Sequence, residues 1–532
     1  MIDEAPFGGY APSMQGPCEI EPELALDAAS ERTFCPTSRR HYVLLAAILA
    51  SALGFIDGSV VSVAMPAMRA DLGASLADAQ WISNAYALAL AALILVGGGA
   101  GDKFGLRKTF IAGIVLFILA SMACAAAPSA GTLILSRGVQ GVGAAFMVPG
   151  SLAIIAKAYP KEERGRAIGI WAASSALTTA IGPVFGGLLL SVFGDAAWRV
   201  IFAINLPLGV LAVAMLLRVP ADQPTGDRKL DVAGAVLATL AFGAMSYGLT
   251  ALSAENAGGG GGVAATLPLT LGAILLVGFI AWEQSHKAPM IDLSLFAVVP
   301  FSGANIATFV LYFALSGILF YLPMLLIAGW GLGEATTAFV FLPLSVAIAG
   351  LSGPVGRLSD AVGPRLPITA GSLVVALAFG GLAAISGAGI HRFWSGAFPM
   401  MVLMGLGMAL VVSPLSTAVM TSVNDEDTGA ASGINNAISR IAGLMAVAAM
   451  GAFAAHRYAS AVGSERALVP GYGEPTSSAL PEALEAVRVT ASDAAFSGIA
   501  WIMCGFCVAS ALVAWLTQQS KQAGPSGGAA AD

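Results

Sequence analysis

The segment Gly98-Gly-Ala-Gly-Asp102-Lys-Phe-Gly105-Leu-Arg107-Lys108 returns 258 residues later as Gly356-Arg-Leu-Ser-Asp360-Ala-Val-Gly363-Pro-Arg365. Both copies have Gly, then Asp four residues on, Gly three further and Arg two beyond that. Each copy joins one long apolar stretch to the next. A short charged turn, used at the same place in two halves of a hydrophobic chain, predicts a membrane protein built from duplicated helix bundles.

Composition excludes a soluble protein. Of the 532 residues, 57% are hydrophobic and only 11% are charged. A soluble chain of this length needs more charge to cover its surface. The 64 glycines are typical of closely packed membrane helices, where small residues let backbones approach. The sequence therefore predicts an integral membrane protein.

Fourteen apolar runs are each long enough to cross a bilayer. We expect them near 42–66, 79–101, 108–127, 131–155, 165–190, 199–218, 231–252, 264–283, 299–325, 334–355, 366–386, 397–421, 429–453 and 495–517. The expected fold is all-α, with two pseudo-symmetric six-helix bundles at 42–218 and 298–517. A linker at 219–297 holds two extra helices, a long external loop lies at 454–494, and tails cover 1–41 and 518–532, the first of them disordered.

Basic residues set the expected orientation. All seven lysines and most arginines fall on the side of the expected spans that also carries both termini. Because cytoplasmic loops of membrane proteins are enriched in Lys and Arg, we expect both termini in the cytoplasm.

Five motifs lie in register on the expected spans. They are the charged turn at 98–108, Phe55-Ile-Asp57-Gly-Ser-Val-Val-Ser-Val-Ala-Met-Pro66, Arg137-Gly-Val-Gln140-Gly141-Val-Gly143, Gly182-Pro183-Val-Phe-Gly186-Gly187, and Trp198-Arg-Val-Ile-Phe-Ala-Ile-Asn205-Leu-Pro207. Together they resemble the major facilitator superfamily, in its fourteen-span drug:proton antiporter branch. The resemblance covers residues 42–517. One departure is Thr178, which stands where the antiporter motif of span 5 usually has Gly.

The resemblance implies the major facilitator fold and a proton-coupled exporter that works by alternating access in a bacterial cytoplasmic membrane. Its partners would be a small lipophilic or cationic substrate, protons and the bilayer, with no cofactor and no nucleic acid. An uptake symporter of the same fold and a non-transporting sensor or assembly partner stay open as alternatives. The chain has no P-loop motif, so we do not expect ATP bound by a P-loop as the energy source. An enzyme is the weakest alternative, and the four His form no metal set.

Asp57 is the only acidic residue that lies away from the ends of an expected span, some 15 residues into the first. A carboxylate at membrane depth is costly unless it is paired, hydrated or protonated, so Asp57 is the candidate proton carrier. The alternative is a solvated aspartate that caps a neighbouring helix. Arg137 is embedded in span 4, and the resemblance suggests that it influences proton coupling through span 1. It could equally be a structural donor to backbone carbonyls.

The two charged turns fit a conformational switch, because an acid near helix ends can bind a helix terminus or an Arg in one state and lose it in the other. The residues assigned to it are Gly98, Asp102, Gly105, Arg107, Lys108, Gly356, Asp360, Gly363 and Arg365. A charged loop that only sets topology is the alternative reading.

The remaining candidates lie in the antiporter motif and in a substrate cavity. The motif residues Gly182, Pro183, Gly186 and Gly187 break one helical hydrogen bond and permit close packing. The cavity candidates are Thr178, Asn305, Tyr312, Asn435, Asn436 and Arg440. Helix-to-helix hydrogen bonding is the alternative for the polar members, and ordinary packing is the alternative for Tyr312.

Overall fold

The computed structural model describes residues 33–224, 230–256, 262–287, 289–424, 427–474 and 480–519, and every regular element in them is a helix. The long helices are α2 (Arg40–Leu72), α3 (Leu76–Phe104), α4 (Leu106–Ala125), α5 (Ala130–Ala158), α6 (Lys161–Phe193), α9 (Val232–Asn256), α10 (Gly262–Ser285), α11 (Val299–Met324), α13 (Leu342–Val362), α14 (Arg365–Gly387), α15 (Phe398–Thr421), α16 (Thr428–Val462) and α17 (Glu482–Thr517). Shorter helices α7 (Trp198–Ala203) and α8 (Asn205–Leu217) together make one crossing, and α12 (Glu334–Ala338) leads into α13.

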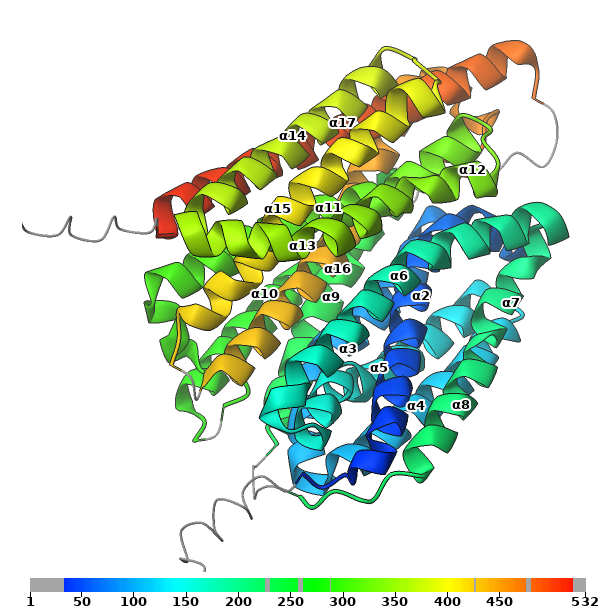
Figure 1. Ribbon diagram of the computed structural model, residues 1–532. Coiled ribbons are helices and arrows are strands. Elements are labelled where there is room, and N and C mark those ends of the chain that lie inside the picture. Colours follow the sequence, from blue (N-terminus) through cyan, green and yellow to red (C-terminus); the bar gives the residue numbers. More distant parts are fainter. Residues whose placement is uncertain are drawn as a thin grey trace, which may run out of the picture.

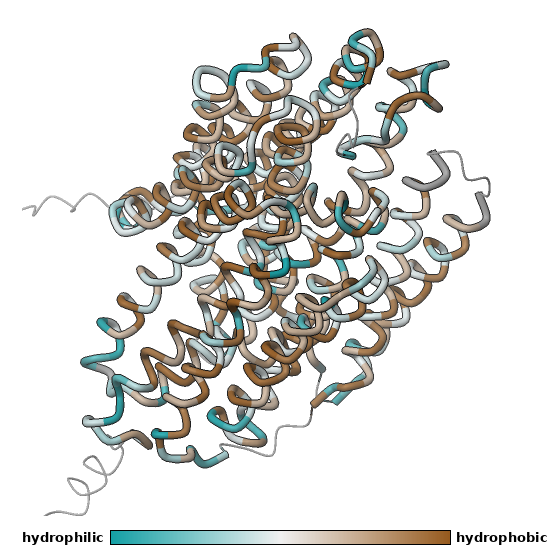
Figure 2. The backbone as a smooth tube through the Cα atoms, turned by 90° about the vertical axis from the view of Figure 1, so that its right-hand side faces the viewer, coloured by the Kyte–Doolittle hydropathy of each residue, from teal (hydrophilic) through white to brown (hydrophobic). Residues whose placement is uncertain are grey.

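Fourteen helical segments among the described residues are long and apolar enough to cross a membrane, which confirms the predicted number. Figure 2 shows hydrophobic residues along the helices and hydrophilic residues gathered towards their ends and connections. Since fourteen is even, the first segment starts and the last segment ends on the same side of the bilayer. We name the two sides by their turns: the Gly105 face carries the α3–α4 turn, and the Gly73 face carries the α2–α3 turn.

The helices form two bundles that lie side by side in Figure 1, with α2, α4, α5, α6 and α8 in one and α11, α13, α14, α15 and α17 in the other. Helices α3 and α16 meet where the bundles adjoin. The extra helices α9 and α10 form a hairpin, and α9 packs on both α3 and α16. The inserted pair therefore covers the line along which the two bundles meet.

The two bundles are joined most firmly at the Gly73 face. There the buried apolar residues of α2 and α3, such as Met65 and Ile82, form one continuous cluster with those of α11, such as Tyr321. Arg69 donates to the carbonyl of Tyr472, and Gln80 donates to the carbonyl of Val447, so hydrogen bonds also cross between the bundles here. Towards the Gly105 face the first bundle has a separate core. The structure is therefore closed at the Gly73 face.

Much of the segment 454–494, which was expected to be an external loop, is helical. Helix α16 continues to Val462 and α17 already begins at Glu482. Both extensions are rich in Ala, and that of α17 also has Glu482 and Glu485, so the helices run beyond the apolar stretches that the span rule detects. One consequence is that Asp493 lies inside α17 and is buried, so Asp57 is not the only acid in a membrane-crossing helix.

Two further boundaries differ from the expected ones. The charged turns are mostly helical: Asp102 lies in the last turns of α3, Asp360 lies in α13, and the connections shrink to single turns at Gly105 and Gly363–Pro364. The predicted tails fall largely outside the described residues, but η1 (Thr37–Arg39) and the start of α2 show that helix begins before residue 42.

Candidate functional site

Asp57 and Arg137 meet in the centre of the first bundle, although 80 residues separate them in the chain. Arg137 Nη1 lies 2.5 Å from Asp57 Oδ2, and the two side chains are 2% and 1% exposed. A small residue also brings α5 directly onto α3 beside this pair, since a Cβ on Gly141 would lie 2.4 Å from the carbonyl oxygen of Tyr86. Arg137 Nε also donates to the carbonyl of Ile82 on α3.

Gln140 completes the binding of the Asp57 carboxylate. Its Nε2 donates to Asp57 Oδ1 at 2.9 Å, and its Oε1 accepts from Arg137 Nη1 at 2.6 Å. The same amide group donates to Ser121 on α4, which also accepts from Asn205 on α8. Four helices of the first bundle thus contribute to one buried polar network. A proton on Asp57 would remove the charge that holds Arg137 and so loosen α2 from α5.

Tyr86 connects this network to the second bundle. The Arg137 guanidinium carbon lies 4.4 Å from the centroid of the Tyr86 ring, and Tyr86 is buried. Arg440 on α16 lies within electrostatic range of both Tyr86 and Tyr312. Within the described residues Arg440 has no hydrogen-bond or ion-pair partner, and it is only partly buried. Arg440 and Tyr312 are therefore brought together at the place where the two bundles face each other.

The other cavity candidates have structural contacts. Asn435 Nδ2 donates to Asn305 Oδ1 at 3.1 Å and to Thr308 Oγ1 at 2.8 Å, which joins α16 to α11. Asn436 is exposed and donates to the carbonyl of Ser432 in its own helix. The Thr178 hydroxyl donates to the carbonyl of Ser174 one turn back. In this state Asn305 and Asn435 therefore make the hydrogen bonds between helices that were the alternative to a place in the substrate cavity.

The antiporter motif touches both bundles. A Cβ on Gly182 would lie 3.3 Å from Ile56 Cα, one residue before Asp57, and a Cβ on Gly186 would lie 2.4 Å from Val60. Gly187 faces the other way, since its Cβ would lie 2.6 Å from the carbonyl oxygen of Glu334 in α12. Helix α6 therefore lies between the helix of Asp57 and the second bundle, at the closed Gly73 face.

At the first charged turn the helix ends are bound by Asp222 instead of Asp102. Asp222 Oδ2 and Oδ1 each accept, at 2.9 Å, from the backbone N–H groups of Leu106 and Arg107 at the start of α4. Lys157 at the end of α5 lies 2.9 Å from Asp222 Oδ2. Arg107 Nε donates to the carbonyl of Leu216 at the end of α8. Asp102 is half-buried and has no such partner in the described part of the chain.

These contacts set the pKa of Asp222. Burial alone would raise the pKa, but the backbone hydrogen bond from Arg107, the side-chain hydrogen bond from Lys157 and the backbone hydrogen bond from Leu106 outweigh burial and hold the pKa below the ordinary value of an aspartate. A carboxyl whose pKa is lowered by folding stabilises the folded state above its ordinary pKa. That contribution is lost as the pH falls through the lowered value.

Replacing Asp222 with Asn is therefore expected to destabilise the protein by about 1–3 kcal/mol at pH 7, because a charged acceptor of three hydrogen bonds is lost. The measurement is the apparent melting temperature in detergent. The difference from wild type should begin to shrink below about pH 4, where the unfolded chain takes up the proton, and should vanish once the pH has fallen through the lowered pKa of the folded state, below which wild-type Asp222 is neutral too. The matched control is Asp102→Asn in the same turn, which should leave the melting temperature unchanged. Equal shifts in both variants would contradict the assignment.

The second charged turn has a different set of contacts. The Arg365 guanidinium carbon lies 3.8 Å from the centroid of a Trp515 ring, so Arg365 packs α14 on α17. A Cβ on Gly356 would lie 3.4 Å from Ser413 Oγ, and Gly363 has a φ of +86°, which favours glycine. Gly98 has open space around it and Lys108 is exposed. The Arg of the two copies therefore packs differently, Arg107 on the end of α8 and Arg365 on α17.

The Major Facilitator Superfamily profile matches residues 47–447, about three quarters of the chain. The chain belongs to the Major Facilitator Superfamily. It is 34% identical over 413 residues to the multidrug resistance protein Stp of Mycobacterium tuberculosis (strain CDC 1551 / Oshkosh), covering 76% of this chain and 75% of Stp. It is 32% identical over 422 residues to the tetracenomycin C resistance and export protein of Streptomyces glaucescens, covering 78% of this chain and 76% of that protein.

Solved structures support the same fold. A bacterial homologue of the human lysosomal transporter Spinster, in an inward-facing and unoccupied conformation, superposes with a TM-score of 0.64 at 18% identity, covering 91% of this chain and 100% of the homologue. This Major Facilitator Superfamily protein is a multi-pass membrane transporter, which confirms the predicted family and fold and the expectation that it is not an enzyme.

Several residues of the site in this Major Facilitator Superfamily protein were not among the predicted ones. Gln140 stood in a quoted motif, and its position three residues after Arg137 was a signal that both side chains share a helix face. Asn205 also stood in a quoted motif, at the opening of the sixth span. Tyr86 and Ser121 come from helices with many similar residues, and no local pattern marks them. Asp222 follows the sixth crossing as one polar residue in a polar linker.

Proposed function

We propose that this chain is a proton-coupled exporter of small molecules, which works by alternating access. The observation that carries the proposal is the buried Asp57–Arg137 pair inside a fold whose relatives include named resistance and export proteins. Proton loading of Asp57 neutralises it and releases Arg137. The network of Gln140, Ser121 and Asn205 then transmits that change to α4, α5 and α8.

The proposed orientation places the Gly105 face in the cytoplasm of a bacterial cell, with the chain in the cytoplasmic membrane. The lysines at 103, 108, 157, 161 and 287 all lie at this face, in agreement with the enrichment of cytoplasmic loops in basic residues. In that orientation the described state is closed to the outside. Substrate would enter from the cytoplasm while Asp57 is ionised, and a proton from outside would follow after the bundles rock.

Roles for the remaining candidates follow from their places. Arg440 lies within electrostatic range of Tyr86 and of Tyr312, and we propose that Arg440 and Tyr312 contact substrate. We propose that Thr178, Asn305, Asn435 and Asn436 belong to the same cavity in other states of the cycle. Gly182, Pro183, Gly186 and Gly187 close the Gly73 face. The two charged turns act as the switch at the Gly105 face, where Asp222 holds the first turn in the described state.

The test is substrate-induced collapse of a pH gradient in inside-out vesicles energised by respiration. Lipophilic and cationic compounds, with drugs among them, are added to vesicles that contain the protein and to vesicles that lack it. Export should dissipate the gradient only when the protein is present, since substrate moves inwards in exchange for protons. An uptake symporter would give no collapse with substrate on that side, and equal responses in both vesicle types would contradict export.

A further inference from the structure

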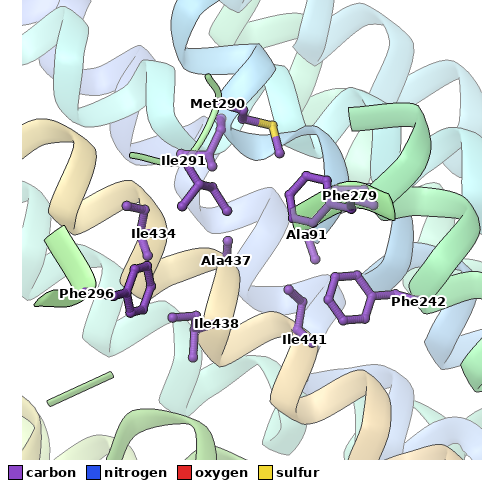
Figure 3. A pocket seen from close by; sticks show the side chains of 13 residues that line it. Ala91, Phe242, Phe279, Met290, Ile291, Phe296, Ile434, Ala437, Ile438 and Ile441 are labelled. Carbon is purple, nitrogen blue, oxygen red and sulfur yellow. The ribbon is translucent and has the colours of Figure 1, made fainter. Parts of the chain in front are cut away.

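Helix α16, which meets α3 where the bundles adjoin, has an apolar face and a polar face. On the apolar face it lines a pocket together with α3, α9 and α10, and Figure 3 shows the residues that it contributes there: Ile434, Ala437, Ile438 and Ile441. The polar residues follow one another at intervals of three, one, three and one: Ser432, Asn435, Asn436, Ser439 and Arg440. Since a helix turns once in about 3.6 residues, these residues share the opposite face. A polar face is unstable against lipid, so this face turns towards the interior of the protein.

Arg440 stands at the inner end of the polar face, about 18 Å along α16 from its start at the Gly105 face. Beyond Arg440 the helix is closed in, because the carbonyl oxygen of Val447 accepts hydrogen bonds from Gln80 and Tyr321. One turn before Arg440, Asn436 is exposed. Arg440 has no hydrogen-bond or ion-pair partner within the described residues, yet none of its nitrogen atoms is both buried and unpaired. Its guanidinium group is therefore accessible, on the Gly105 side of the closed region.

The accessible charge at this place is positive. Asp57 is buried, and its two carboxylate oxygens accept from Arg137 and Gln140. The other acid well inside a membrane-crossing helix of the described chain, Asp493, lies in α17 near the Gly73 face. Neither carboxylate pairs with Arg440. A cation that reaches the end of the polar face would be repelled by the guanidinium group, and an anion would be attracted.

We propose that the substrate is a lipophilic organic anion whose carboxylate group is bound by Arg440. The guanidinium group is a planar fork that matches a carboxylate in two parallel hydrogen bonds. Tyr312 on α11 lies within electrostatic range of Arg440 and adds an aromatic ring and a hydroxyl group at the same place. The proposal rests on the proposed function and deepens it by naming a substrate class. That class differs from the cationic substrate that the resemblance allows.

The anion site is separate from the proton carrier. Arg440 belongs to α16 of the second bundle, whereas Asp57 belongs to α2 of the first and is held by Arg137. Substrate charge and proton are therefore bound by different groups, and a substitution can remove one without the other. Asp57→Asn is accordingly expected to retain the preference for an anion.

The test is equilibrium binding of radiolabelled anthracene-9-carboxylate to the purified full-length protein in nanodiscs of a zwitterionic phospholipid, without a proton gradient. Anthracene-9-carboxamide has nearly the same shape without the charge, and it serves as the neutral probe. The wild type should bind the carboxylate at least about tenfold more tightly, since hydrogen bonds between charged groups are stronger than neutral ones. Arg440→Gln should weaken carboxylate binding to the level of the amide and leave amide binding unchanged.

Two further variants make this result specific. Arg457→Gln removes an exposed arginine from the same helix near the Gly73 face, and it should change the binding of neither probe. Arg440→Lys keeps the charge but loses the planar fork, so it should retain part of the preference. The Lys variant also tests the site if the Gln variant fails to fold.

Three outcomes would overturn the proposal. The first is a wild type without preference for the carboxylate, whether it binds both probes or neither. The second is a preference that survives in Arg440→Gln, which would place the anion beside another basic residue. The third is an equal loss of both probes in Arg440→Gln together with a lower melting temperature, which would make Arg440 a structural residue. Because no gradient is present, these results are independent of the vesicle test: an exporter of other compounds would still collapse the gradient.

Discussion

Replacing Asp57 with Asn is expected to reduce substrate-induced proton movement to the level of vesicles that lack the protein. Asn has almost the same shape as Asp and can still accept a hydrogen bond from Gln140 Nε2, which lies 2.9 Å from Oδ1 in the wild type. It cannot bind and release a proton. Exchange of labelled substrate for unlabelled substrate, which needs no net proton movement, should continue. The combination of lost coupling and retained exchange is the expected signature of the proton carrier.

The variant also leaves Arg137 buried without its counter-charge. Breaking a buried ion pair by removing one partner costs about 3–5 kcal/mol. Lower stability is therefore expected, and melting temperature must be measured alongside transport. Asp57→Glu keeps a carboxyl group and should preserve part of the coupling. If the Asn variant does not fold, the Glu variant still shows whether the pH dependence of transport shifts with the identity of the acid at this position.

A matched control lies on the same helix. Asp71 in α2 is also ion-paired, with Arg199, and it accepts from Trp198 Nε1, but its side chain is 28% exposed at the Gly73 face. Asp71→Asn should therefore keep proton coupling. If coupling survived in Asp57→Asn, the proton would be carried elsewhere. Asp493 would be the next residue to test, since it is buried in α17 and contacts His391, Trp330 and Ser386.

The sequence predicts the crossings well because a bilayer demands long apolar runs, and these can be counted. It does less well where helices extend past the apolar core: α16 and α17 were cut short, and Asp493 was missed for that reason. Asp57 and Arg137 could be named in advance because charge is rare inside spans. That they pair could not be read from spacing, since it depends on how α2 and α5 lie against each other.

Contacts between distant polar residues were the hardest to predict. The capping of α4 by Asp222 requires the α8–α9 connection to fold back over the charged turn, and no local pattern encodes that path. Asp231 and Glu283 are 52 residues apart and meet only because the hairpin brings the start of α9 to the end of α10. Tyr86 was overlooked because an aromatic residue in a membrane helix is usually a packing residue.

Replacing Gly187 with Val is expected to prevent normal closure of the Gly73 face. Even a Cβ at this position would lie 2.6 Å from the carbonyl oxygen of Glu334 and 2.8 Å from Ala338 Cβ, and backbone cannot yield as a flexible side chain can. Overpacking of this kind costs about 1–3 kcal/mol, which shifts a two-state equilibrium by about 5- to 150-fold. Transport should fall accordingly, because the carrier can no longer return readily to the state that is closed on this side.

The measurement is the distance between spin labels at Asp195 and Leu468, which lie on the Gly73 face in different bundles, in a background without native cysteines. Gly187→Val should move the distribution to longer distances. Gly169→Val is the matched control, since it makes the same change on α6 at a position with no atom within 4 Å of the added Cβ. A transport defect without a longer distance would mean that Gly187 does not act by closing the Gly73 face. It would instead act within the first bundle, where Gly182 and Gly186 of the same helix contact α2.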